Sequence, residues 1–200
     1  MNFTSGDYQR LSELKLAAMK DHSDWLEQLL ANLDHCGLDG QAALKYLKDH
    51  RVEVSLRDQP TAARWTLTGQ LQLHPRYADG ASDAAYPLSL IIHEVKHLQQ
   101  GFFIALSVYG ELEAWQLQFS FLKSLTGIYH PETNPNNVIQ ELMSLPLNGN
   151  RDTLRQARQR MQAYAGKRYR VDLLPLYPLP KELMFILTQR EFGSDNRLRK

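Results

Sequence analysis

The chain has 200 residues, 43% of them hydrophobic, which is enough to build one buried core and argues against a disordered chain. Its 23 basic and 22 acidic side chains nearly cancel. The net charge therefore gives no indication of a nucleic-acid or membrane partner.

The cysteine count and the apolar stretches indicate where the protein works. Cys36 is the only cysteine, so the chain forms no internal disulfide and needs no oxidising compartment. The first residues lack the basic start and apolar run of a secretory signal. The most apolar stretches, residues 88–92 and 102–108, are too short or too interrupted to cross a bilayer core of about 30 Å. We therefore expect a soluble, cytoplasmic protein with no membrane partner.

The first half of the chain reads as helices followed by strands. Apolar residues recur at helical spacing over residues 8–33 and 38–50, which predicts two helices. The period then changes to two over residues 52–56 and 65–73, which predicts two strands. Residues 58–61 between them suggest a hairpin-like connection.

The second half is helical in pattern. Gly101 and Gly127 stand where C-terminal helix caps are expected, and the Pro-rich run over residues 174–180 predicts an extended connector. The predicted helices cover residues 87–100, 107–125, 138–145, 151–165 and 180–191.

Together these elements predict a mostly helical α+β fold, with a small antiparallel sheet or hairpin ahead of the helix over residues 87–100. We expect one domain over residues 1–200. Its segments are an N-terminal helical part (1–50), a core (51–127) and a C-terminal helical part (128–200).

The core contains a motif that predicts a metal site, His93-Glu94-Val95-Lys96-His97. On a helix, residues four apart lie about 40° apart around the axis, so His93 and His97 can offer two imidazole nitrogens to one ion. Glu94, rotated by about 100°, can take a proton from a bound water. Zn²⁺ suits these donors, because with three protein ligands it keeps a position for water.

The next helix supplies two candidates for the third ligand, Glu111 and Glu113. Glu111 lies at the edge of the apolar stripe formed by Val108, Leu112, Trp115, Phe119 and Leu122, so we favour it as the ligand. Glu113 falls on the opposite side, where a solvated or supporting carboxylate is expected. His130 is a further alternative, as a ligand or as a donor to the reaction's oxyanion, although we favour its interpretation as a plain loop histidine.

The HExxH motif followed by Glu111-Leu112-Glu113-Ala114 resembles the zincin metallopeptidases of the gluzincin type. The resemblance covers about residues 87–125. It implies His93, His97 and Glu111 as zinc ligands, with Glu94 as the general base. In zincins a strand upstream of the active helix binds an extended peptide, a part that residues 65–73 could play. Trp115 stands where many gluzincins carry an Asp that supports a histidine.

The resemblance implies a zinc-dependent peptidase, with a peptide or protein as the substrate. It would hydrolyse peptide bonds through a metal-bound water, with Glu94 accepting its proton. The alternative is a zincin-fold protein that serves as a binding or regulatory module without peptidase activity.

A basic segment over residues 151–170 holds seven basic residues and one acid, Asp152. One interpretation is contact with nucleic acid or with an acidic partner. The other, which we favour, is a solvated helix face that pairs with the more acidic N-terminal half.

Overall fold

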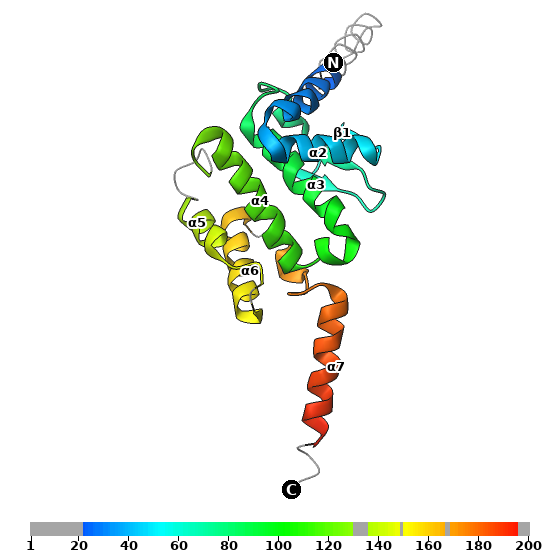
Figure 1. Cartoon of the computed structure of the whole chain (residues 1–200), viewed down its shortest axis with the longest axis vertical. Helices are drawn as coiled ribbons and strands as arrows, with labels where there is room; N and C mark the ends of the chain where they lie inside the picture. Colours follow the sequence, from blue (N-terminus) through cyan, green and yellow to red (C-terminus); the bar gives the residue numbers. More distant parts are fainter. Residues whose placement is uncertain (1–21, 130–135, 149, 167–168, 196–200) are drawn as a thin grey trace, which may run out of the picture.

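A computed structural model describes residues 22–129, 136–148, 150–166 and 169–195 (Figure 1). Residues 22–32 are helical and lead into the short 3-10 helix η1. From there the elements are η1 (Leu33–His35), α2 (Gly37–Asp49), β1 (Val54–Leu56), β2 (Ala63–Trp65), β3 (Leu71–Leu73), η2 (Pro75–Tyr77), α3 (Ala85–Ala105), α4 (Val108–Thr126), α5 (Asn136–Ser144), α6 (Arg151–Ala165), η3 (Val171–Leu173) and α7 (Leu179–Asp195).

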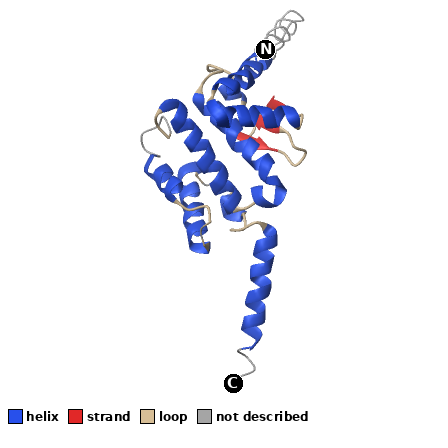
Figure 2. Ribbon diagram, in the orientation of Figure 1, coloured by secondary structure: helices blue, strands red, loops and turns tan. Residues whose placement is uncertain are grey.

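The predicted mostly helical α+β fold is confirmed, with one small sheet beside the helices (Figure 2). Helices occur at each predicted place in the described residues, with ends shifted by a few positions. The N-terminal part of the helix predicted over residues 8–33 lies outside the described residues. At the other end, the predicted connector is shorter, because α7 already begins at Leu179.

The predicted small antiparallel sheet or hairpin is confirmed only for the antiparallel pair of β2 and β3, and the antiparallel pairing of the whole sheet was wrong. The sheet is mixed and has the order β1-β3-β2, in which β1 runs parallel to β3 and β2 runs antiparallel to it. The alternating stretch over residues 65–73, predicted as one strand, contains the turn between β2 and β3 instead. It is interrupted at Gly69, whose φ of 80° favours glycine, and the Thr66 side chain accepts a hydrogen bond from the Gln70 backbone N–H.

Two hydrophobic clusters flank the α3–α4 pair. The first packs α2 and the sheet against α3, with Leu88, Ile91 and Val95 among its buried residues. The second packs α4 against α5, α6 and the connector that precedes α7, with Leu112 and Trp115 in it. The polar side chains of His93, Glu94 and His97 on α3 are therefore buried between apolar packing on both sides.

Glycines shape the turn from α3 into α4. Gly101 has a φ of 68° and a non-helical ψ, so it ends the regular part of α3, as predicted. The chain then turns back, and α4 begins at a cap in which the Ser107 side chain accepts from the Gly110 backbone N–H. Gly110 allows the two helices to approach, because a Cβ there would lie 2.1 Å from the backbone oxygen of Ile104.

Gly110→Ala should therefore destabilise the protein, by roughly 1–3 kcal/mol or more, because the backbone of the α3–α4 turn would have to move. The measurement is the free energy of unfolding in urea. Gly80→Ala is the matched control, since its Cβ would meet only the Tyr77 oxygen at an ordinary 3.5 Å. Equal stability of the two variants would contradict the role given to Gly110.

Candidate metal centre

The HExxH motif lies on the buried face of α3. His93, Glu94 and His97 are all buried, and they lie in the regular part of the helix before Gly101. The turn described above brings the first turn of α4, with Glu111, back beside them. The sequence thus places the motif and the following glutamate on adjacent helices, as predicted.

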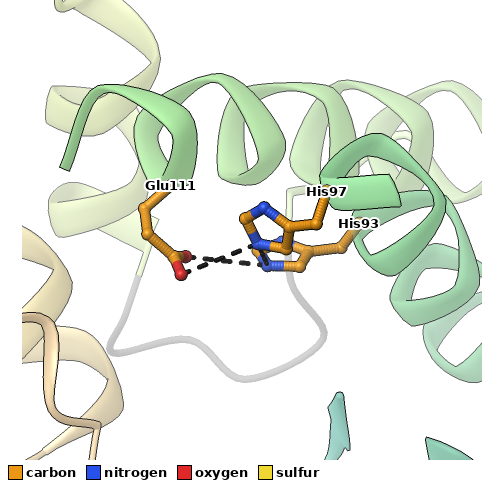
Figure 3. A group of neighbouring side chains, drawn as sticks. All are labelled: His93, His97 and Glu111. Carbon is orange, nitrogen blue, oxygen red and sulfur yellow. Dashed lines mark hydrogen bonds and ion pairs between the residues drawn. The ribbon is translucent and has the colours of Figure 1, made fainter. Parts of the chain in front are cut away.

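Three side chains converge between α3 and α4 (Figure 3). The Nε2 atoms of His93 and His97 lie 3.0 Å apart. The Glu111 carboxylate lies 3.8 Å from the His93 Nε2 and 3.6 Å from the His97 Nε2. Tetrahedral zinc with bonds of about 2.0–2.2 Å holds its donors roughly 3.3–3.6 Å apart, and the three distances lie within a few tenths of an ångström of this range. His93, His97 and Glu111 could therefore hold a metal ion.

The choice between the two glutamates is clear in the geometry. Glu111 faces the histidines, whereas Glu113 points to Lys96, 2.7 Å from its Nζ, and accepts a hydrogen bond from Gln100. Glu113 is thus a supporting carboxylate and not part of the cluster. The alternative ligand His130 lies outside the described residues.

The pKa values of the three groups in the cluster depend on one another. Burial lowers the pKa of His93 to about 3, helped by the nearby His97. Burial alone would lower the pKa of His97, but the Glu111 carboxylate beside it raises it to about 9. Burial would raise the pKa of Glu111, but the two histidines and a hydrogen bond from Tyr169 lower it to about 2. Without a metal, His97 is therefore the protonated, positively charged imidazole of the cluster, and it lies next to an ionised Glu111 and a neutral His93.

This proton makes metal binding depend on pH. A metal on the His97 Nε2 must displace the proton, so zinc affinity should rise about tenfold per pH unit below the His97 pKa of about 9. Between pH 6 and pH 8 we expect a gain of about 100-fold. Zinc titrations against a competing chelator at three pH values measure it, and an affinity that is constant over this range would contradict the assignment.

Glu94 is held apart from the cluster, and it faces a cavity. Its carboxylate accepts a hydrogen bond from the backbone N–H of Trp65 at the end of β2. Burial raises its pKa to about 7, and the Glu111 charge adds to this, although the backbone hydrogen bond and His97 lower it. A carboxylate with a pKa near neutrality can both take and return a proton.

The cavity beside Glu94 has a volume of about 260 Å³. His93 and Glu94 lie in its wall, next to residues 60–63 of the loop and strand β2. The opposite side comes from α4, α6 and the segment that follows α6. The lining side chains are largely apolar, with Arg76 and Gln118 among the polar ones; the apolar and aromatic residues include Tyr86, Leu90, Trp115, Phe119, Tyr164 and Tyr169.

Two further groups support the cluster and were not predicted. The Tyr169 hydroxyl donates a hydrogen bond to Glu111, and the Trp115 indole N–H donates to the Tyr169 oxygen at 2.9 Å. Trp115 therefore acts on the Glu111 carboxylate, through Tyr169. Tyr169 lies 58 positions beyond Glu111, and no spacing rule in the sequence connects the two. Gln100 also contacts His97.

The basic segment is largely paired within the described residues. Arg151 forms a bidentate pair with Glu182, Arg155 pairs with Asp152, and Arg160 with Glu141. Arg158 donates to the Leu174 carbonyl and Arg170 pairs with Asp172. These partners lie within residues 141–182. For the described residues, the predicted pairing with the acidic N-terminal half was therefore wrong. Nucleic-acid contact stays an untested prediction.

Comparison of the chain with protein families, curated proteins and solved structures finds no match. No helix in the described part of the chain is long and apolar enough to span a membrane.

Proposed function

We propose that the chain is a zinc-dependent peptidase with a gluzincin-like site, in which His93, His97 and Glu111 hold the metal. The observation that carries the proposal is the convergence of these three donors at metal-ligand spacing, beside a buried carboxylate that is not itself a donor. Two histidines and one carboxylate form a donor set typical of catalytic zinc, which leaves one position open.

Zinc bound there would polarise a water molecule and the carbonyl group of the bond to be cleaved. The protein supplies the proton transfer. Glu94 faces the cavity, and its pKa of about 7 suits a group that accepts a proton from water and passes it to the leaving amine. The Trp65 backbone N–H orients the Glu94 carboxylate for this role.

Strand β2 supports a peptide as the substrate. It is an edge strand, paired with β3 on one side, and its first residue Ala63 lines the cavity beside Glu94. An extended peptide can add to such an edge by main-chain hydrogen bonds. The strand that serves this purpose in the proposal is the short β2, which shares only Trp65 with the predicted stretch of residues 65–73.

The proposal is tested by digesting a peptide library and identifying the products by mass spectrometry. Cleavage should occur with the zinc-loaded protein, stop after chelation and return when zinc is restored. Stoichiometric metal without any cleavage would instead favour the binding or regulatory module.

A further inference from the structure

Gln100 links the metal cluster to a second set of polar groups between α3 and α4. It lies three positions after His97, close to one helical turn. Its Oε1 is 3.1 Å from the Nδ1 of His97, on the side of the ring away from the cluster. Its Nε2 donates to two oxygens of α4, the Gly110 carbonyl at 2.9 Å and the Glu113 carboxylate at 3.0 Å.

These contacts fix the orientation of the Gln100 amide. Gly110 O and Glu113 Oε2 are both acceptors, so the group that faces them must be the NH₂. The amide oxygen then faces His97 and can only accept. His97 must therefore carry a proton on Nδ1, which leaves its Nε2 as the nitrogen that binds a metal.

Glu113 is held in place from its other side. Its second carboxylate oxygen lies 2.7 Å from the Nζ of Lys96, and both side chains are about one-quarter exposed. The ion pair fixes one end of the network, and the Gly110 backbone fixes the other. Gln100 thus has partners for its oxygen and for both amide hydrogens, so its orientation is well defined.

We propose that Gln100 is a positioning residue that holds His97 in its Nδ1–H form and thereby aims the Nε2 lone pair at the metal. Glu113 and Gly110 fix the Gln100 amide for this purpose. The inference rests on the metal-binding part of the proposed function and not on hydrolysis. It also gives Glu113 a role. The Glu113 carboxylate orients the Gln100 amide, and this amide orients His97.

Partners of this kind on a metal-binding histidine are typically worth 10–100-fold in metal affinity. Gln100→Leu removes the acceptor and keeps a similar volume, so zinc affinity should fall by about 10–100-fold. Gln99→Leu is the matched control, since Gln99 is the exposed neighbour on the same helix, and its zinc affinity should not change. Equal affinities of the two variants would overturn the proposal.

A spectroscopic measurement on the unmodified protein tests the proposal without any variant. In a long-range ¹H–¹⁵N spectrum of the zinc-loaded protein, His97 should carry its proton on Nδ1 and bind zinc through Nε2. Zinc on the His97 Nδ1, with the proton on Nε2, would overturn the proposal even if Gln100→Leu failed to fold. A protein with this spectrum that cleaves no peptide would contradict the proposed catalysis alone.

Discussion

Glu94→Gln should leave zinc binding intact and lower kcat for peptide hydrolysis by roughly 10²–10⁴-fold, the range typical of a lost general base. The amide has nearly the shape of the carboxylate but cannot accept a proton from water. Glu94 also lies outside the cluster of donors, so the metal should stay. The measurements are kcat on a cleaved peptide and the zinc content of the same sample.

The matched control for this variant is Glu141→Gln, which removes a carboxylate that is exposed on α5 and pairs with Arg160. It should hydrolyse the peptide like the unmodified protein. Unchanged hydrolysis by Glu94→Gln would remove Glu94 from the mechanism.

Glu111→Gln should reduce zinc affinity by roughly 1,000-fold or more, because it removes the one negative charge among three ligands. The neutral amide also gives up the charge that faces both histidines in the metal-free protein. Zinc titration against a competing chelator measures the effect.

Glu113→Gln is the comparison, two positions away on the same helix. It leaves His93, His97 and Glu111 unchanged, but it removes the charge that pairs with Lys96 and loosens the Gln100 amide, so its effect should stay within about 10–100-fold. A larger loss from Glu113→Gln than from Glu111→Gln would contradict the assignment of the third ligand.

The sequence predicted the cluster because helical periodicity determines which side chains share a face. His93 and His97 lie four apart on a helix whose apolar residues are buried, and the stripe through Leu112 and Trp115 placed Glu111 on the enclosed side of α4. Both inferences use spacing within one helix.

Contacts between distant segments could not be obtained in this way. Tyr169 reaches Glu111 across 58 positions, and the segment that carries it is placed by the packing of α6 and the connector against α4. Gln100 was visible beside the motif, but its role depends on the close approach of Gly110 and Glu113 from the next helix. Such contacts follow from tertiary packing.

The sheet was mispredicted for a similar reason. Alternation of apolar and polar residues continues from Trp65 to Leu73, but it does not show that the chain reverses at Gly69. The parallel pairing of β1 with β3 is also a non-local contact. The hairpin matters for the site, because it makes β2 the edge strand and brings the Trp65 backbone N–H to Glu94.

The decisive measurement for a metal centre in this protein is the zinc content of the purified chain, determined by elemental mass spectrometry beside that of Glu111→Gln. We expect one zinc per chain in the unmodified protein after dialysis and almost none in the variant. Absence of stoichiometric zinc from the unmodified protein, or equal zinc in both, would contradict a metal centre formed by His93, His97 and Glu111.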